Sequence, residues 1–150
     1  MADIELRSSA FNDHDIMPRR LSRLGDNVSP PLTWSDPPDG TAQLVLMVED
    51  PDSVEPAFLH WLVTDIDPEA CGVDEGDVPR GGRESINGFG DLGWGGPQPP
   101  KGDPPHRYFF RLWAVDRPLE LPEQPGTHDV HQAVKGHELA SGVLVGLFQR

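Results

Sequence analysis

The fold is decided by the stretch QLVLMVEDPD, residues 43–52. Its apolar run is nearly continuous and is bounded by turn residues, which is the pattern of a strand covered on both faces. The run stops at Asp50-Pro51-Asp52. Because ligand-binding and catalytic groups often lie where a buried strand ends, this point is the first candidate for a functional site.

Two further strands follow this one along the chain. His60–Ile66 is apolar, and in Arg107–Val115 alternate side chains share one face. Between them lies Gly81–Pro105, which is rich in Gly and Pro but carries Phe89 and Trp94. A connection of this length favours a packed or functional loop over a tether.

The outer parts of the chain predict smaller elements. Repeated prolines in residues 27–40 force extended or turn backbone and indicate an ordered loop and an edge strand. Near the other end, Thr127 is a candidate cap for a short helix, and Val143–Phe148 is a candidate last strand. The apolar face of that helix would comprise Val130, Ala133, Val134 and His137.

Composition agrees with strands joined by structured loops. Gly (16) and Pro (17) exceed a fifth of the 150 residues, whereas helical bundles keep both out of their element interiors. Recurrent apolar stretches argue against disorder. The length suits one core, so residues 1–150 are interpreted as a single domain.

The charge excludes several partners. With 25 acidic and 12 basic residues the formal net charge is −13, so the surface as a whole repels nucleic acid and anionic membranes. Only Lys101 and Lys135 are lysines, and the acids are spread along the chain. This profile suits a salt-loving organism and equally an ordinary acidic protein.

The cysteine count and the N-terminus bear on the compartment. Cys71 has no partner for an intrachain disulfide, and Met1–Arg7 lacks the apolar core of a secretory signal, so we expect a cytoplasmic protein. No apolar run approaches the roughly 20 residues needed to cross a bilayer, so we expect no membrane span.

Several titratable groups lie at predicted strand ends. Asp50 and Asp52 point the same way if the backbone stays extended, and Tyr108 shares a face with His106. If the three strands are neighbours, these side chains and His60 can converge on one pocket. A carboxylate bonded to one imidazole nitrogen favours the charged ring and leaves the other nitrogen to donate to an anion.

Each of these residues also has a structural interpretation. Asp50-Pro51-Asp52 is a good turn initiator, and either histidine could be a hydrogen-bonded core or rim residue. Tyr108 on an alternating strand is more often a packing residue than a ligand. The Gly/Pro stretch could serve only as a rigid cover over the sheet.

The order of the motifs resembles the phosphatidylethanolamine-binding protein family, also called the Raf kinase inhibitor-like family, in its short prokaryotic form. The likeness covers almost the whole chain, including the ending LVGLFQR. The motifs are, in order, Asn27 through Trp34, Asp50-Pro51-Asp52, Pro56-Ala57-Phe58-Leu59-His60-Trp61, Asn87-Gly88-Phe89-Gly90, Gly95-Gly96-Pro97-Gln98-Pro99-Pro100 and His106-Arg107-Tyr108.

The resemblance implies a β-sandwich in which a large antiparallel sheet packs on a smaller sheet, with a few short peripheral helices. It also implies an anion pocket at one end of the sandwich, because members of the family bind phosphoryl headgroups there. On the matching positions Asp50, His60, His106 and Tyr108 would line this pocket. Asp52 and Pro99-Pro100 would frame it, and the backbone near Gln98 would add a donor.

Two positions depart from the family pattern. The family often has Ala-Pro directly after Asp-Pro-Asp, where this chain has Ser53-Val54 and then Pro56. The change removes a proline from one wall, and with it the residue that makes a cis peptide cheap. Gln98 stands where prokaryotic relatives commonly have Cys, so the rim lacks a thiol.

Three function classes follow. The first is a non-enzymatic protein that binds a small anionic or phosphorylated ligand without a cofactor, with a possible regulatory role. The second is a protein inhibitor of a kinase or protease that acts through surface contacts, as some relatives do. The third is a metal-dependent enzyme that uses the Asp/His cluster, although no established metal motif or serine-hydrolase elbow is present. Relatives are often dimers, which is the only ground for expecting a homodimer.

Overall fold

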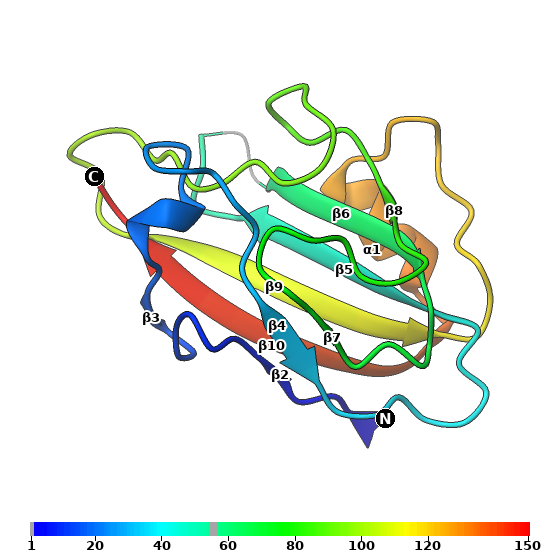
Figure 1. Ribbon diagram of the computed structural model, residues 1–150. Coiled ribbons are helices and arrows are strands. Elements are labelled where there is room, and N and C mark those ends of the chain that lie inside the picture. Colours follow the sequence, from blue (N-terminus) through cyan, green and yellow to red (C-terminus); the bar gives the residue numbers. More distant parts are fainter. Residues whose placement is uncertain (1, 55–56) are drawn as a thin grey trace.

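The computed structural model describes residues 2–54 and 57–150, and its strands form two sheets (Figure 1). The path of the larger sheet is β1 (Ala2–Asp3), β10 (Glu138–Phe148), β9 (His106–Val115), β5 (Gln43–Asp50), β6 (Phe58–Ile66) and β8 (Arg83–Glu84), with β3 (Asp15–Ile16) also paired to β10. The smaller sheet is β2 (Leu6–Arg7), β4 (Leu32–Trp34) and β7 (Gly72–Val73). The predicted mostly β fold with a large and a smaller sheet is confirmed.

The four long strands pair in the antiparallel manner that the family resemblance implies. β5 lies between β6 and β9, and β9 pairs in turn with β10. At the outer edge of β10, however, the short strands β1 and β3 run parallel to it. The larger sheet is therefore antiparallel in its body and mixed at one edge.

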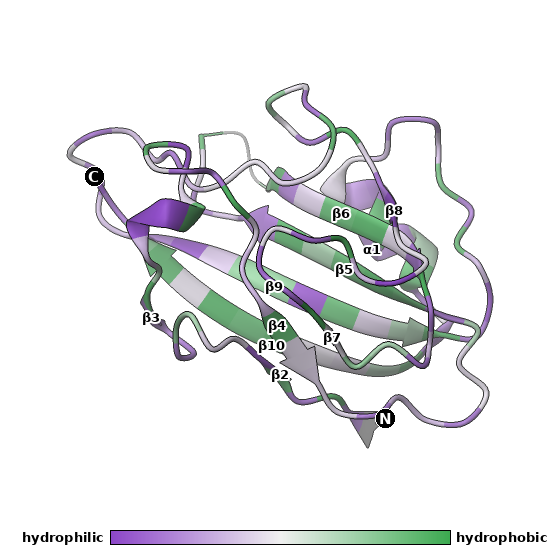
Figure 2. Cartoon of the chain, in the orientation of Figure 1, coloured by the Kyte–Doolittle hydropathy of each residue, from purple (hydrophilic) through white to green (hydrophobic). Residues whose placement is uncertain are grey.

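Strand β5 is buried along its whole length, as its apolar pattern predicts. Alternate side chains of β5 point to opposite faces of the sheet. One face packs on the smaller sheet in a cluster that includes Leu44, Leu46, Val48, Leu32 and Trp34. The other face packs on helix α1 in a cluster that includes Val45, Met47, Trp113, Val130 and Val134. Figure 2 shows the apolar residues concentrated on these strands.

The smaller sheet differs from its prediction in one respect. β4 is its central strand and not an edge strand, because β2 pairs with one side of it and β7 with the other. The Trp34 indole also donates a hydrogen bond to the Ala70 carbonyl at 2.7 Å. The partners of β4 come from distant, short segments that carry no strand pattern of their own.

Helix α1 (Thr127–Val134) begins at the residue that was expected to cap it. Gly126 is the N-cap, and the Asp129 carboxylate accepts a hydrogen bond from its backbone N–H at 2.8 Å. The Thr127 hydroxyl instead donates to the Ala57 carbonyl at 3.0 Å and ties the helix to the segment before β6. His137 lies beyond the end of the helix. The other helix is the short 3-10 turn η1 (Arg19–Leu21).

Two strands are longer than the sequence predicts. β6 begins at Phe58 and not at His60. β10 begins at Glu138 and not at Val143, because a stretch without an apolar pattern pairs with β9, Ala140 lying opposite Ala114. Sheet pairing therefore extends both strands beyond their recognisable apolar cores.

The long loop between β6 and β9 is packed, as predicted. It contains β8 and an isolated bridge between Ile86 and Leu92. Within the loop the Asn87 side chain donates to the Gly93 carbonyl at 2.9 Å. The Trp94 indole also donates to the Leu21 carbonyl at 3.0 Å, which fixes the loop to η1.

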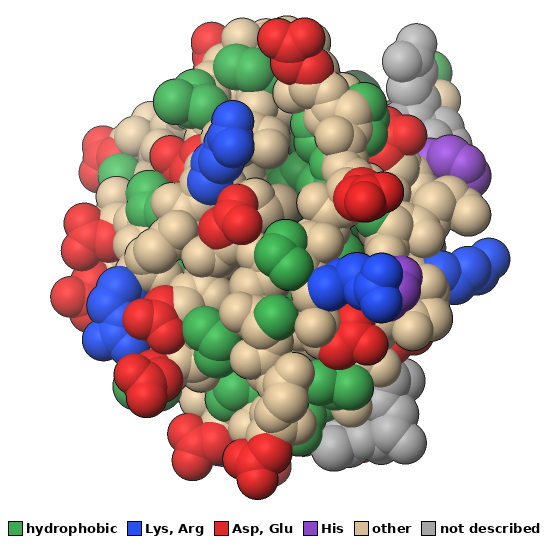
Figure 3. All heavy atoms as spheres, turned by 90° about the vertical axis from the view of Figure 1, so that its right-hand side faces the viewer, with side chains coloured by type: hydrophobic (Ala, Val, Ile, Leu, Met, Phe, Trp, Pro, Cys, Tyr) green, Lys and Arg blue, Asp and Glu red, His purple; other side chains and the backbone are tan. Residues whose placement is uncertain are grey.

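The surface carries the charge that the composition predicts. Figure 3 shows one side of the molecule, where Asp and Glu side chains are scattered and not gathered into one patch. Among the residues that the structure describes, no helix has the length and apolar character needed to span a bilayer.

We predict that Leu46→Ala lowers the free energy of unfolding by about 2–5 kcal/mol, because Leu46 is fully buried in the core and its truncation leaves a cavity. Leu92→Ala is the matched control, since Leu92 is 66% exposed and its truncation should cost less than about 0.5 kcal/mol. Urea unfolding of the two variants measures the difference. Equal losses would contradict the packing described for β5.

Candidate functional site

The candidate residues lie together at one end of the larger sheet, where β5 ends and β6 and β9 begin. Because β5 is antiparallel to both β6 and β9, its last residues lie beside the first residues of both neighbours. Asp50 is the Cα partner of Phe58, and Glu49 is the partner of Phe109. His60 on β6, and His106 and Tyr108 on β9, lie within two residues of the start of their strands. The predicted convergence of the three strand ends is confirmed.

A cavity of about 270 Å³ opens at this end of the sheet. Seven of the eight residues predicted for the ligand site line it, and Asp52 does not. Their role in binding a ligand stays a prediction. The lining residues are Asp50, Ser53, Val54, Phe58, His60, Phe89, Gln98, Pro99, Pro100, His106 and Tyr108.

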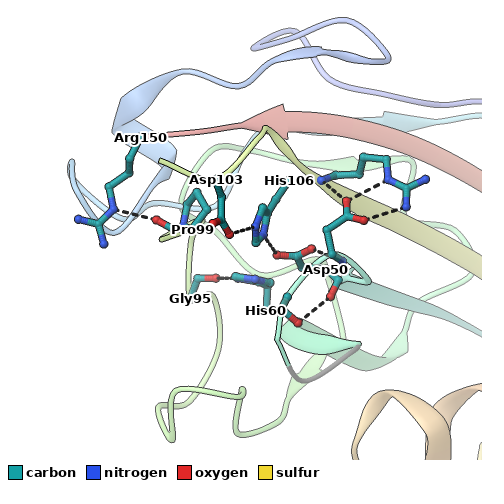
Figure 4. Close-up of polar contacts among 10 residues, drawn as sticks. Asp50, His60, Gly95, Pro99, Asp103, His106 and Arg150 are labelled. Atoms are coloured by element: carbon teal, nitrogen blue, oxygen red, sulfur yellow. Dashed lines mark hydrogen bonds and ion pairs between the residues drawn. The ribbon is translucent and has the colours of Figure 1, made fainter. Parts of the chain in front are cut away.

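The His106 imidazole is held between two carboxylates. Its Nδ1 lies 2.7 Å from Oδ2 of Asp50, and its Nε2 lies 3.0 Å from Oδ2 of Asp103 (Figure 4). Asp50 is itself fixed, because its Oδ1 accepts a hydrogen bond from the Asp52 backbone N–H at 2.8 Å. The sequence predicted one carboxylate partner and a free second nitrogen. In the structure, a carboxylate lies within hydrogen-bond distance of each ring nitrogen.

These carboxylates favour the charged form of His106. Burial of the ring opposes the charge and by itself would lower the pKa. The hydrogen bonds to Asp50 and Asp103, together with the negative charges of both carboxylates, outweigh burial and raise the pKa of His106 above its ordinary 6.5. The charged form of His106 is therefore favoured more strongly than that of a free histidine.

His60 has the opposite character. Its Nδ1 donates a hydrogen bond to the Gly95 carbonyl at 2.6 Å, and its side chain is almost fully buried. Burial lowers the pKa of His60 from 6.5 to about 4, against the smaller favourable effects of the Gly95 carbonyl and of Asp50. A neutral ring that donates through Nδ1 presents a lone pair at Nε2. His60 is therefore an acceptor in its resting state.

Tyr108 lies between the two histidines. Its ring meets that of His60 edge-on at 5.1 Å between centroids and stacks on that of His106 at 6.4 Å. Burial raises the pKa of the Tyr108 hydroxyl, with the charges of Asp50 and Asp52 adding to the effect, so the hydroxyl stays protonated. Among the residues that the structure describes, this hydroxyl has no hydrogen-bond partner. It is a donor available to a ligand.

An aromatic wall faces these polar groups. The Phe58 ring lies 4.9 Å from the His60 ring and 4.7 Å from the Phe89 ring, measured between centroids. The Arg23 guanidinium covers the Phe89 ring at 4.0 Å. Most of the cavity is therefore apolar, and its polar groups are few.

The opposite rim is formed by residues 98–100 and is anchored by two arginines. Arg150 Nε donates to the Pro99 carbonyl at 2.8 Å (Figure 4), and Arg23 Nε donates to Oε1 of Gln98 at 3.3 Å. The backbone N–H of Gln98 forms no hydrogen bond with any part of the chain that the structure describes. It lies where the predicted backbone donor was expected.

Asp52 has a structural role beside the site. The chain turns directly after Asp50, so the two carboxylates do not point the same way as an extended backbone would require. Both oxygens of Asp52 instead accept hydrogen bonds from the Arg107 guanidinium at 2.9 Å. The hydrogen bond from Arg107 lowers the pKa of Asp52 and outweighs its partial burial. This pair fastens the turn to the first residues of β9.

The departure from the family pattern lies at the mouth of the cavity. Val54 lines the cavity and is 91% exposed, so it is an apolar residue at the entrance. Pro56, and with it any question of a cis peptide there, lies outside the described residues.

Sequence reasoning missed three contributors. Phe58 is two residues before His60 on the same strand, and this spacing was a usable signal for a shared face. Phe89 was assigned only to loop packing. Asp103 gave no signal, because it lies in a Gly/Pro loop three residues before the strand.

The arrangement differs from a facial metal triad. Both ring nitrogens of His106 are engaged with carboxylates, and Nδ1 of His60 is engaged with a backbone carbonyl. Over residues 2–54 and 57–150, no group of three His, Cys, Asp or Glu side chains is placed to hold a metal ion.

Comparisons with known proteins identify the family and agree with the fold. The family described as phosphatidylethanolamine-binding protein matches residues 7–149. A UPF0098 protein of Methanothermobacter thermautotrophicus is 39% identical over 152 residues, which are 98% of this chain and 99% of the relative.

Two crystal structures share the fold over nearly their whole length. CT736 of Chlamydia trachomatis, described as a homologue of the same family, has a TM-score of 0.87 and 33% identity, with 100% of this chain and 99% of that chain covered. YbcL of E. coli, described as a new member of the mammalian family, has a TM-score of 0.89 and 26% identity, with 99% of each chain covered.

The buried neutral His60 predicts a loss of stability in acid. As the pH falls from 6.5 toward 4, the unfolded chain takes up a proton that folded His60 resists, so stability falls by up to about 3 kcal/mol. In His60→Asn the side-chain amide can still donate to the Gly95 carbonyl, and this share of the loss should disappear. Urea unfolding across that pH range measures it, with His128→Asn at an exposed position as control. Parallel pH profiles for wild type and His60→Asn would contradict the assignment.

Proposed function

This chain belongs to the phosphatidylethanolamine-binding protein family, and we propose that it binds a small phosphorylated or otherwise anionic ligand in the cavity at the end of β5. The observation that carries the proposal is the Tyr108 hydroxyl, a protonated donor without a partner among the described residues, on a residue that lines the cavity beside His106. An oxygen of an anion in the cavity can accept the hydrogen bond that this hydroxyl has to offer. The Gln98 backbone N–H supplies a second open donor.

His60 narrows the chemistry of the ligand. Because its Nε2 carries a lone pair in the resting state, a fully deprotonated anion would repel it. A phosphate monoester can offer a P–O–H group to this nitrogen and charged oxygens to Tyr108 and the Gln98 N–H. Alternatively, the anion is accompanied by a proton that His60 takes up. In both cases binding is linked to one proton.

The aromatic wall suits a group attached to the anion. Phe58 and Phe89 face the cavity, and Val54 extends the apolar surface to its mouth. An apolar or ammonium-bearing substituent can lie on aromatic faces at low desolvation cost. We therefore propose an organic phosphate and not inorganic phosphate as the preferred guest.

The source of the phosphoryl group is either a lipid headgroup or a free metabolite. Soluble phosphoethanolamine presents the headgroup as a free metabolite. Vesicles of zwitterionic lipid that contain phosphatidylethanolamine present the same headgroup in a membrane. Because the protein carries a formal net charge of −13, anionic vesicles are a poor probe. Binding to vesicles but not to the soluble headgroup would assign the lipid, and the reverse would assign the metabolite.

We propose binding without covalent chemistry. The cationic ring has both nitrogens in hydrogen bonds to carboxylates, so it is not poised to remove a proton from a nucleophile. Elemental analysis of protein purified without added metal, together with a fluorophosphonate probe, would detect the two enzyme classes considered from the sequence.

Tyr108→Phe removes only the donor that carries the proposal. We expect it to weaken phosphoethanolamine binding about ten- to a hundredfold, the value of a hydrogen bond to a charged group. Isothermal titration calorimetry measures the affinity, and thermal unfolding checks that the variant keeps its fold. Unchanged affinity in a folded variant would overturn the placement of the anion beside Tyr108.

Affinity should also depend on the charge of His106. Its pKa is raised above 6.5, so binding is strongest below that raised value and weakens as the pH rises through it. Sulfate is the probe for this test, because its own charge does not change across the histidine range. His106→Gln should bind weakly and lose the share of the pH dependence that is due to His106, leaving only the share linked to His60, whereas His128→Gln should behave as wild type. A pH-independent wild-type affinity would contradict the role of His106.

A further inference from the structure

The His106 ring has no donor left for a ligand. A charged imidazole has two N–H groups, and here one is directed at Asp50 and the other at Asp103 (Figure 4). The position on Nε2 that an anion would take is therefore occupied by a carboxylate of the chain itself.

The two carboxylates are held very differently. Asp50 is 3% exposed, ends β5 and accepts a second hydrogen bond from the Asp52 backbone. The Asp103 side chain is 42% exposed and bonds only to His106 among the described residues. One of the two can leave the ring at little cost.

The segment that carries Asp103 is suited to movement. Residues 101 and 102 are exposed in a turn, and a Cβ on Gly102 would meet nothing within 4 Å. Its tie to the rim is a backbone hydrogen bond from Asp103 to the Pro100 carbonyl at 3.2 Å. Pro100 lines the cavity and Asp103 does not, so Asp103 approaches His106 from beside the cavity.

We propose that Asp103 is an internal competitor for the anion, which a ligand must displace from Nε2 of His106. This inference rests on the proposed anion-binding function and adds the residue that sets its affinity and charge selectivity. With Asp103 in place, the charges on Asp50, Asp103 and His106 leave one net negative charge beside the cavity. When Asp103 swings away, that local charge becomes neutral and a donor is released.

The other titratable groups around His106 do not change this conclusion. Asp52 is paired with Arg107 on the neighbouring turn. His60 is neutral and Tyr108 stays protonated. Asp103 is therefore the one negative charge next to His106 that is both exposed and held by a single side-chain contact among the described residues.

The consequence for selectivity is specific. Because Asp103 repels in proportion to the charge of the ligand, it penalises a dianion more than a monoanion. Asp103→Asn should tighten binding of sulfate about tenfold, equivalent to about 1.4 kcal/mol, and should tighten acetate binding by less. Asp39→Asn is the matched control: it makes the same change in net charge in an exposed loop beyond the opposite end of β5.

The experiment is calorimetric titration of wild type, Asp103→Asn and Asp39→Asn with sulfate and with acetate, at a pH where His106 is protonated in all three. NMR titration of the His106 ring establishes that pH, and the pKa of His106 should be lower in Asp103→Asn, because one favourable carboxylate is lost. Tighter sulfate binding in Asp103→Asn alone supports the internal competitor.

Other outcomes overturn it in distinguishable ways. Equal affinity of wild type and Asp103→Asn would leave the anion pocket intact and reject the competition. Weaker binding by Asp103→Asn would make Asp103 a positioning residue for the ring. If wild type and Asp103→Asn both failed to bind sulfate, acetate and phosphoethanolamine, the proposed function and this inference would both be rejected.

Discussion

The antiparallel placement of β5 between β6 and β9 is the constraint on which the site depends. A strand buried on both faces must lie inside the sheet, and its neighbours must run against it for their first residues to meet its last. That single arrangement gathers Asp50, His60 and His106 from segments far apart in the sequence. The site is thus built on buried, paired strands in the body of the larger sheet, which suits a pocket that holds its polar groups in fixed positions.

The two histidines that line the cavity have pKa values shifted in opposite directions, because their surroundings differ. Both are buried, and burial alone disfavours charge. His106 has two carboxylates in hydrogen-bond contact, which reverse that effect, whereas His60 has a backbone carbonyl, which does not. In the proposed function, a ring that favours its charged form beside a neutral acceptor fits a ligand that is both negatively charged and able to carry a proton.

The sequence alone predicted those parts of the structure that follow from strand periodicity or from the order of the family motifs. It predicted the long strands, both histidines and Tyr108, because these residues lie on or next to strongly apolar strands. It did not predict that Asp52 turns toward Arg107, because alternation of side chains ends where the backbone turns, and Asp-Pro-Asp is a turn sequence. It could not predict the contact of Asp103 with His106 or of Gly95 with His60, since the Gly/Pro loop has no periodicity from which distances follow. β4 was misplaced for a related reason: its neighbours are two-residue strands.

An anion pocket in so acidic a protein is physically consistent. Charges on the surface act through water and salt, and beyond about 8–10 Å they are largely screened. Within the cavity a ligand would lie against apolar walls, where the local dielectric is low and the nearest charges dominate. The nearest charges are those of His106, Asp50 and Asp103, and of these only Asp103 is on an exposed loop. In the proposed function, a preference for anions would therefore be decided by these three side chains more than by the net charge, and the position of one loop carboxylate would change it.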